Sequence, residues 1–288
     1  NVGSYNITAA SATGGTFSAS NYNISYVNGS LAVTAAPLTI TANSASTQYG
    51  LGTALGSTAF TTSGLMNNET VGSVTLASAG TAATSNVGAY NISAASVTGG
   101  NFTASNYNIA YVNGTLNVTP ASITVSTNNQ SRGYGSANPT SGTVTLSGGT
   151  LYNGDTLGNA TLNSAATATS NVGNYTLVGS AQTLSTGLIS NYNVTYVNGT
   201  LAVTPAALTI TANSTSTQYG LGTTLGTTAF STSGLMNGET VGNVVLSSAG
   251  SAAATNVGAY NISAASVTGG NFTASNYNIS YANGTLNV

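Results

Sequence analysis

Charge is almost absent from this 288-residue sequence: Arg132 is the only basic residue, and Glu69, Asp155 and Glu239 are the only acids. Ordinary globular proteins are about a quarter charged. One arginine cannot form the basic surface that phosphate groups require, so we expect no nucleic-acid partner. The formal net charge of −2 leaves little electrostatic repulsion between copies, which favours self-association with identical chains in a fibre.

Cysteine, histidine and lysine are also missing. Their absence excludes disulfides, thiolate metal sites, histidine bases and Schiff-base chemistry. Asn153-Gly154-Asp155 resembles part of a calcium loop. Calcium takes about six to eight oxygen ligands and usually several carboxylates, so a plain turn is the expected structure here. We therefore expect no enzyme activity, no cofactor and no metal site.

Long apolar runs are missing too. No stretch approaches the roughly 20 apolar residues that a membrane-spanning helix needs, so we expect no membrane insertion within this segment. The chain starts at Asn1 without methionine and stops at Val288 inside a strand-like segment, and we expect it to be an excerpt of a longer polypeptide. Disorder is not expected, because 41% of the residues are hydrophobic.

What the sequence does contain is a repeat. The tripeptide Asn-Val-Gly begins at residues 1, 86, 171 and 256, which are 85 residues apart. Four tyrosines recur at the same spacing, namely Tyr26, Tyr111, Tyr196 and Tyr281. A fixed period of this kind is the signature of a tandem array of folded units.

The copies align into one partial and three full repeats. Residues 1–36 form the C-terminal part of a preceding repeat, and the full repeats span 37–120, 121–205 and 206–288. The segment LTITANS begins at both Leu38 and Leu208, whereas the middle repeat has ITVSTNN in its place. We therefore call the first and third full repeats A type and the middle one B type.

Alternation of hydrophobic and hydroxyl side chains predicts β-strands throughout each repeat. The most regular stretch contains an Asn-Gly pair, which is typical of a two-residue hairpin turn with positive φ at both positions. Such a hairpin would pair Tyr111 with Leu116 and Ile109 with Val118, and would bury all four. The predicted turns are Asn28-Gly29, Asn113-Gly114, Asn198-Gly199 and Asn283-Gly284, and the equivalent buried set of the middle repeat is Val194, Tyr196, Leu201 and Val203.

About six or seven short strands in each 85-residue repeat predict an all-β, linear tandem array of small immunoglobulin-like β-sandwich units. The alternative is a β-grasp-like unit with a minor helix. No stretch shows helical periodicity, and at most the segment 64–71 forms one short helical turn. Short connections such as Thr119-Pro120-Ala121 predict stiff joints, because proline fixes its own φ.

One tyrosine precedes a glycine in each repeat: Tyr49, Tyr134 and Tyr219. Aromatic faces with a polar tip suit sugar stacking, which makes these three residues candidate surface aromatics. The other interpretation is a half-buried tyrosine whose hydroxyl anchors a loop. Asn-x-Ser/Thr glycosylation patterns, such as the one at Asn91, are frequent, but chance matches are expected in a chain rich in these residues.

An ordered series of motifs resembles the MBG/YDG-type repeats of large secreted bacterial proteins, including filamentous-haemagglutinin-like adhesins. In the third repeat the motifs are Leu208–Asn213, Tyr219-Gly220, Gly234–Thr240, Asn256–Tyr260, Asn276–Ile279 and Gly284–Leu286. The resemblance implies an extracellular, repetitive, surface-attached protein. The residue after Tyr-Gly is Leu51, Ser136 or Leu221 and not aspartate, which is a departure from the family pattern that argues against metal-assisted binding.

Two functional classes remain. The first is the structural repeat region of an extracellular filament or stalk that provides self-association, surface attachment or biofilm cohesion. The second is an adhesin whose repeats bind glycans or neighbouring cells directly. Near-identity of the A-type repeats favours the first, because every unit then presents the same surface to its neighbours.

Overall fold

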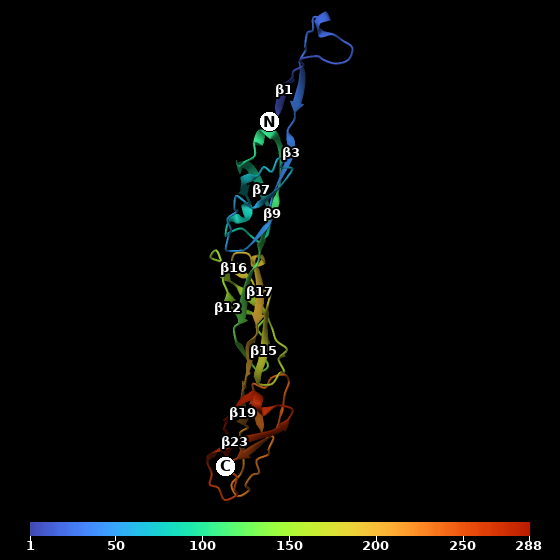
Figure 1. The fold of residues 1–288 in the computed structure, drawn as a ribbon. Helices are drawn as coiled ribbons and strands as arrows, with labels where there is room; N and C mark the ends of the chain where they lie inside the picture. Colours follow the sequence, from blue (N-terminus) through green and yellow to red (C-terminus); the bar gives the residue numbers. More distant parts are fainter. The chain divides into compact units, whose positions relative to one another are not determined.

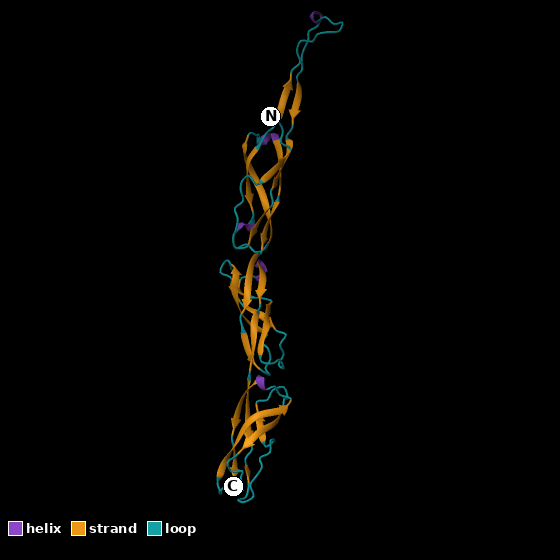
Figure 2. Cartoon of the chain, turned by 60° about the horizontal axis from the view of Figure 1, so that its bottom comes forward, coloured by secondary structure: helices purple, strands orange, loops and turns teal.

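A computed structural model describes residues 1–288. The chain is all-β, and its only helices are five three-residue 3₁₀ turns (Figure 2). No helix has the length and apolar character needed to cross a membrane. Two compact units are present: residues 1–121 with 190–193, and residues 122–189 with 194–288. The elements are labelled in Figure 1.

The first unit contains an N-terminal two-stranded sheet, followed by the first A-type repeat. The two-stranded sheet consists of β1 (Gly3–Ile7) and β2 (Gly29–Val33), with η1 (Ala19–Asn21) between them. The repeat consists of β3 (Ala36–Ala42), β4 (Ala45–Gln48), β5 (Phe60–Ser63), β6 (Val71–Ala77), η2 (Ala79–Thr81), β7 (Gly88–Gly100), η3 (Ala104–Asn106), β8 (Tyr107–Val112) and β9 (Gly114–Thr119). Its strands form two mixed sheets, β5-β3-β8 and β4-β9-β7-β6.

One hydrophobic core joins the two sheets of this repeat. Leu38 and Ile40 of β3 meet Ile92 of β7 and Leu116 of β9, and all four are fully buried. Every second residue of β3 faces this core, as the period-two pattern predicts. Because both sheets bury one face against the other, the repeat is a small β-sandwich.

The second unit contains the B-type repeat and the second A-type repeat. The B-type strands are β10 (Ala121–Thr127), β11 (Gln130–Gly133), β12 (Ser141–Gly149), β13 (Thr156–Leu157), β14 (Asn159–Asn163), β15 (Gly173–Ser180), β16 (Leu184–Thr186), β17 (Tyr192–Val197) and β18 (Gly199–Thr204), with η4 at Ile189–Asn191. The A-type elements are β19 (Ala206–Ala212), β20 (Thr215–Ser216), β21 (Phe230–Ser233), β22 (Val241–Ser247), β23 (Ala259–Gly270), η5 (Ala274–Asn276), β24 (Tyr277–Ala282) and β25 (Gly284–Asn287).

The two repeat types differ in how their sheets are connected. In the A type, the sheets are separate. In the B type, the longer strand β12 pairs with both β10 and β14, so seven strands form one continuous sheet in the order β11-β18-β15-β14-β12-β10-β17. Glu69 and Asp155 are 86 residues apart, one more than the 85-residue period. The additional residue lies in the loop at 150–155, which follows β12 directly and ends in a turn with a hydrogen bond from Asp155 N to Tyr152 O.

The predicted Asn-Gly hairpins are wrong. The strands on either side of Asn113-Gly114 do not pair with each other: β8 pairs in parallel with β3, and β9 pairs antiparallel with β7 and in parallel with β4. The chain therefore crosses from one sheet to the other at Asn113. Neither Asn113 nor Gly114 has a positive φ. The same crossing occurs at Asn283-Gly284. At Asn198-Gly199 the flanking strands β17 and β18 also do not pair with each other, although both belong to the continuous B-type sheet, and Asn28-Gly29 leads into β2, which pairs only with β1.

Close approach of the backbone explains the glycine at these positions. A Cβ atom on Gly114 would lie 2.5 Å from Ala42 O, and one on Gly199 would lie 2.4 Å from Thr127 O. The crossing also divides the predicted core. Leu116 and Val118 are buried, but Ile109 is only partly buried and Tyr111 is exposed, because they lie on β8 in the other sheet. Leu201 and Val203 of the B-type repeat are likewise buried, whereas Val194 and Tyr196 are partly buried.

The segment 64–71, for which at most one helical turn was expected, forms no helix. Gly64 and Asn67 have positive φ values, and Glu69 N donates to Met66 O at 2.9 Å, which closes a tight turn before β6. A β-grasp unit with a minor helix is therefore not what the chain forms.

Candidate functional site: the joint between successive repeats

The joint of the second unit brings four recurring motifs together, and two further copies in the first unit show parts of the same arrangement. One repeat contributes its Tyr-Gly and Asn-Val-Gly segments, and the next contributes its single acid and a Ser-Asn-Tyr segment that ends a 3₁₀ turn. The joint is described below for the second unit, where both sides are complete, and then for the first unit.

Asn276 links the two repeats of the second unit through both atoms of its amide group. Its Oδ1 accepts a hydrogen bond from Val172 N at 2.9 Å, and its Nδ2 donates to Asn171 Oδ1 at 2.9 Å. The side chain is only 1% exposed. A buried amide is stable only when its polar atoms are paired, and here the pairing crosses the joint.

Two tyrosines share one carboxylate at the same joint. Tyr134 of the B-type repeat donates its hydroxyl to Glu239 Oε1 at 2.5 Å, and Tyr277 of the following repeat donates to Oε2 at 2.5 Å. The Tyr277 hydroxyl also accepts from Met236 N at 2.9 Å. The two rings meet edge to face, with centroids 5.5 Å apart and an interplanar angle of 77°. This is a favoured geometry for aromatic pairs.

The carboxylate and the burial together hold both phenols in the protonated form. Burial is the main cause that raises the pKa of Tyr277 to about 12, and the hydrogen bond to Glu239 adds to it. For Tyr134 the hydrogen bond to Glu239 is the main cause of a raised pKa, followed by burial. Both phenols therefore stay hydrogen-bond donors to Glu239 at neutral pH.

Apolar side chains make the joint continuous with the core of the next repeat. Tyr134 and Val203, at the end of the B-type repeat, belong to the same buried cluster as Leu208 and Ile210 of the A-type repeat. Val172 packs against that cluster as well. The end of the B-type repeat therefore contributes to the core of the next repeat, while Leu162, Ala166, Leu177 and Leu201 form a separate cluster within the B-type repeat.

The first unit repeats this arrangement at residues 190–193. Asn191 Oδ1 accepts from Val87 N at 2.9 Å, and Asn191 Nδ2 donates to Asn86 Oδ1 at 2.9 Å. The rings of Tyr49 and Tyr192 lie edge to face, with centroids 5.5 Å apart and an interplanar angle of 81°. The agreement with the second unit shows that the joint is a reproducible element of the array.

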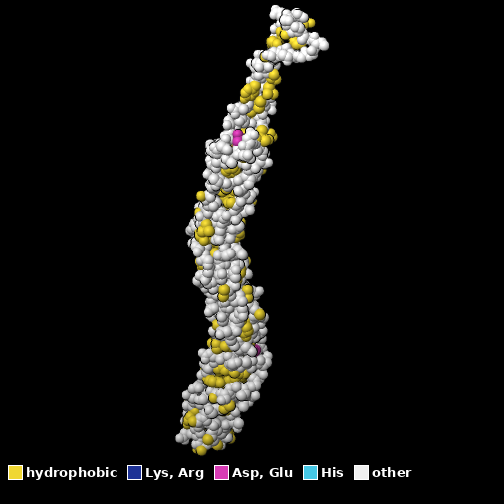
Figure 3. Space-filling view, viewed as in Figure 1, with side chains coloured by type: hydrophobic (Ala, Val, Ile, Leu, Met, Phe, Trp, Pro, Cys, Tyr) yellow, Lys and Arg dark blue, Asp and Glu magenta, His cyan; other side chains and the backbone are white.

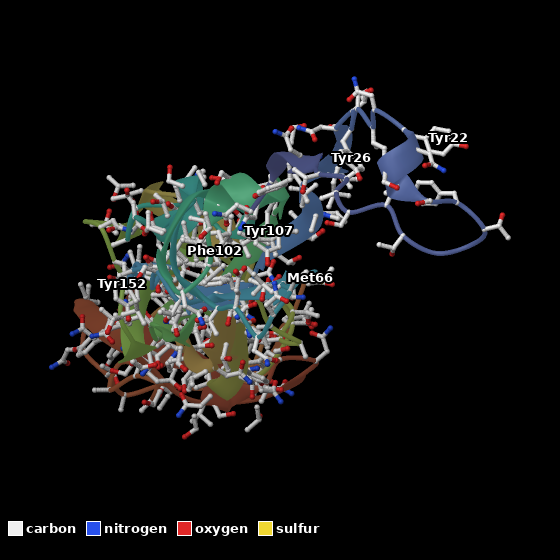
Figure 4. All side chains as sticks on the ribbon, turned by 45° about the horizontal axis from the view of Figure 1, so that its top comes forward. Tyr22, Tyr26, Met66, Phe102, Tyr107 and Tyr152 are labelled. Atoms are coloured by element: carbon white, nitrogen blue, oxygen red, sulfur yellow. The ribbon has the colours of Figure 1, made fainter.

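A third copy of the joint lies at the start of the first A-type repeat. Asn106 Oδ1 accepts from Val2 N at 2.9 Å, and Tyr107 donates to Glu69 Oε2 at 2.5 Å while accepting from Met66 N. Figure 4 shows Tyr107 and Met66 close together. A cavity of about 170 Å³ lies beside Glu69 and Tyr107. Its lining includes Val2, Val33, Ala36, Met66, Glu69 and Tyr107.

The scarce acids therefore have a structural position. Glu69 and Glu239 each follow the same tight turn and accept a tyrosine hydroxyl at a joint, and Asp155 follows the equivalent turn in the B-type repeat. No three His, Cys, Asp or Glu side chains lie together anywhere in the chain. The recurrence of one acid in each repeat was visible in the sequence. The tyrosines that Glu69 and Glu239 contact were not.

Tyr49 and Tyr134 do not form a surface row, which corrects their interpretation as candidate surface aromatics. They are 4% and 3% exposed because the following repeat covers them. Tyr219, in the third full repeat, is 58% exposed. The anchoring interpretation is the one that fits Tyr134, whose hydroxyl binds Glu239.

The joint asparagines were missed by reasoning from the sequence. Asn106, Asn191 and Asn276 lie in Ser-Asn-Tyr segments that recur every 85 residues, and this spacing was the available signal. In a sequence so rich in asparagine, a recurring asparagine does not stand out. Asn191 and Asn276 act as links because they are buried, and this burial arises only where two repeats pack together.

Arg132 is buried without a carboxylate partner. Its Nε donates to Asn138 Oδ1 at 2.7 Å, Nη1 to Gly133 O at 3.1 Å and Nη2 to Thr167 O at 2.5 Å. The guanidinium thus ties strand β11 to two loop segments of the B-type repeat. The only basic side chain is therefore buried and adds almost no charge to the surface.

Tandem all-β units that repeat one joint define a class of β-sandwich repeat protein. Within this class the chain belongs to the MBG domain family of YGX type, whose model matches residues 38–117, 123–202 and 208–287. The Tyr-Gly pair of the YGX signature is the pair that enters the joint. Repeats of this type are typical of extracellular or surface proteins. No curated protein matches the sequence significantly.

Proposed function

We propose that the chain is the structural repeat region of an extracellular filament or stalk, that it acts without catalysis, and that it associates with identical chains. The observation that carries the proposal is the joint. Buried Asn276, the Tyr134–Glu239–Tyr277 cluster and the packing of Val203 into the core of the next repeat tie one repeat to the next. A chain built this way transmits force along its length through packed contacts, which is what a stalk requires.

The outward faces of the sheets support association between chains. Figure 3 shows that most of the visible surface is neither charged nor hydrophobic. The terminal sheet strands β6 and β22 contain no charged residue, although natural edge strands are commonly protected by lysine or proline. Neighbouring chains can therefore approach each other without burying unpaired ions.

The alternative function, direct binding of glycans or cells by the repeats, has less support. It drew on a row of exposed tyrosines, and two of the three are buried in joints. A glycan array and a cell overlay with the 288-residue chain separate the two proposals. Specific binding of a defined sugar by the chain would favour the adhesin.

Sedimentation velocity over a range of protein concentrations tests association between chains. Thr75, Thr161 and Val245 are exposed, outward-facing residues on β6, β14 and β22. The triple variant Thr75→Glu, Thr161→Glu and Val245→Glu adds three negative charges to a chain whose net charge is −2. We expect the unmodified chain to associate with rising concentration and this variant to stay monomeric.

The matched control replaces the same three residues by glutamine, which has nearly the same size as glutamate and no charge. Continued association of the glutamine variant would assign the loss to charge. If the unmodified chain stays monomeric at every concentration, and electron microscopy of native material shows only single chains, the proposed association is wrong.

A further inference from the structure

The segments that begin and end each full repeat run side by side in the same direction. In the first A-type repeat, β3 and β4 begin the repeat, and β8 and β9 end it. β3 pairs in parallel with β8, and β4 pairs in parallel with β9. Ala36 is opposite Tyr107 and Gln48 is opposite Thr119, so partners in both sheets are 71 residues apart. The two segments therefore form one parallel pair in a single register.

The other two full repeats contain the same parallel pair. In the B-type repeat, β11 is parallel to β18, with Gln130 opposite Leu201. In the second A-type repeat, β19 is parallel to β24 and β20 is parallel to β25, with Ala206 opposite Tyr277. The separation is again 71 residues. Because the register recurs although the A and B types connect their sheets differently, the parallel pair is a feature of the repeat itself.

Side-chain hydrogen bonds continue the parallel pair between its two halves. Thr115 N donates to Ser44 Oγ at 3.1 Å, and Ser44 lies between β3 and β4, where the strand pairing is interrupted. The equivalent bonds run from Thr200 N to Asn129 Oδ1 at 2.8 Å and from Thr285 N to Ser214 Oγ at 3.0 Å. The interruption is therefore bridged in all three repeats.

Buried side chains line one face of the parallel pair. Leu38 and Ile40 of β3, and Leu116 and Val118 of β9, are each 4% exposed or less. Backbone hydrogen bonds that are exposed to solvent open more readily than those beside a packed core. The core therefore protects the hydrogen bonds of the pair from competition with water.

The parallel direction decides how the pair responds to tension. Tension along the chain enters the repeat at the start of β3 and leaves it at the end of β9. These points lie at opposite ends of the pair, because its two segments run in the same direction. The force then acts along the strands, so that many hydrogen bonds must lengthen together before the pair separates. In a hairpin the loaded ends would be adjacent, and the bonds would break one at a time.

We propose that the parallel pair is a shear clamp that bears the tension in each repeat. In the first repeat, residues 49–106 lie between the two halves of the clamp in the sequence and stay unloaded until the clamp separates. A single residue connects one clamp to the next, as between Thr204 of β18 and Ala206 of β19, so the tension passes directly from repeat to repeat. The inference rests on the proposed function, since a clamp has a role only in a chain that bears tension.

Pulling the same folded chain in two directions tests the clamp. The chain has no cysteine of its own, so introduced cysteines can attach it to the two handles of an optical trap. Pro37→Cys with Pro120→Cys loads the pair in shear. Pro37→Cys with Asn108→Cys peels it from one end, because Pro37 is opposite Asn108. All three residues are exposed, and we expect the first repeat to unfold at a several-fold higher force in shear.

Proline substitutions on β4 test which hydrogen bonds resist the force. Thr217 N, the equivalent of Thr47 N, donates to Asn287 O at 2.9 Å. Backbone N–H groups alternate in direction along a strand, and β4 is an edge strand, so Thr47 N faces β9 and Ser46 N faces away from it. Thr47→Pro removes a donor from the clamp, and the matched Ser46→Pro removes none. We expect only Thr47→Pro to lower the shear force.

Val74→Ala separates mechanical strength from thermodynamic stability. Val74 is 1% exposed on β6, outside the clamp. Its truncation leaves a cavity and lowers the free energy of unfolding measured in urea. Resistance to force depends on the barrier to unfolding and not on this free energy. We therefore expect the shear force to change much less in Val74→Ala than in Thr47→Pro.

Equal unfolding forces in the two pulling directions, or equal shear forces for the two proline variants, would overturn the clamp. A shear force that follows the free energy of unfolding, wherever the substitution lies, would overturn it as well. These measurements use single chains and do not depend on association. A failed clamp in a chain that associates in sedimentation would leave the proposed function standing, whereas a strong clamp in a chain that never associates would contradict only the proposed association.

Discussion

At the scale of single residues, the joint depends on phenol hydroxyls that share a carboxylate. Tyr277 is 6% exposed and contacts Glu239, Met236 N and the ring of Tyr134. The hydrogen bond to Glu239 needs the neutral phenol as donor, whereas the Tyr277 oxygen accepts from Met236 N in either protonation state. Deprotonation would place a second negative charge beside Glu239.

Alkaline pH is therefore expected to weaken the second unit. The pKa of Tyr277 is about 12 in the folded chain against 10 for an ordinary tyrosine. The folded state then binds the proton more tightly, so the stabilisation is fully present below pH 10 and is lost as the pH rises through 12. The loss should be on the order of 2 kcal/mol. Urea unfolding at a series of alkaline pH values measures it.

Tyr277→Phe is expected to flatten this pH dependence, since the titrating hydroxyl is removed. Tyr281→Phe serves as the control for loss of one exposed tyrosine hydroxyl. If the free energy of unfolding of Tyr277→Phe still falls as steeply with rising pH as that of the unmodified chain, another group causes the loss.

Leu116 tests the core of the first A-type repeat. It is fully buried on β9 between the two sheets. Leu116→Ala should lower the free energy of unfolding by about 2–5 kcal/mol, because it removes buried methyl groups and leaves a cavity. Val112→Ala, at a position that is 45% exposed, should change it by about 0.5 kcal/mol or less. Circular dichroism during urea unfolding of the full chain measures both, and a loss well below 1 kcal/mol for Leu116→Ala would contradict the burial.

At the scale of elements, the same sequence forms a strand in one place and not in another. Residues Tyr277–Ala282 form β24, which pairs in parallel with β19. The nearly identical Tyr22–Val27 forms no strand, and Figure 4 shows Tyr22 and Tyr26 on the segment beyond β1 and β2. The difference is the partner: β24 lies beside β19, whereas no strand of the structure pairs with Tyr22–Val27. Strand propensity alone does not create a strand without a neighbour.

The crossing glycine gives an element-scale prediction. Gly114→Ala should destabilise the first A-type repeat by about 1–3 kcal/mol, since the added Cβ would lie 2.5 Å from Ala42 O and the backbone must shift. Gly29→Ala is the matched control in the same Asn-Gly context. Its Cβ would meet Ile7 Cβ at 3.5 Å, an ordinary contact.

Thermal melting followed by circular dichroism compares the two glycine variants. Equal melting temperatures would contradict the account in which close approach of Ala42 O, and not turn geometry, selects glycine at the crossing.

At the scale of the whole chain, the joints decide whether repeats unfold together. Tyr134 and Val203 share a core with the following repeat, so the B-type repeat and the second A-type repeat should unfold in one cooperative transition. Asn276→Ala removes both hydrogen bonds to the Asn171–Val172 segment and should cost about 1–3 kcal/mol. We expect this variant to split the transition in differential scanning calorimetry.

Asn278→Ala is the control, because Asn278 is exposed two residues further along the chain. If Asn276→Ala unfolds in a single transition with an unchanged ratio of van't Hoff to calorimetric enthalpy, the apolar contacts alone couple the two repeats.

Much of this organisation could be predicted from the sequence. The 85-residue spacing predicted the tandem array, and the resemblance to MBG/YDG-type repeats agrees with the family match. Alternation along Leu38–Ala42 predicted which face of β3 is buried. The hairpins failed because Asn113-Gly114 fits a tight turn as well as it fits a crossing between sheets. The sequence contains no local signal that separates the two.

The sequence by itself determined the all-β character, the repeat and the uncharged surface, because period-two alternation, fixed spacing and composition are local or countable properties. Only the tertiary structure decided which strands pair, that Tyr49 and Tyr134 are covered, and that Asn191 and Asn276 are buried polar links. These properties arise where one repeat meets the next. Their physical cause is long-range packing, which places residues together that are about a hundred positions apart, such as Val172 and Asn276.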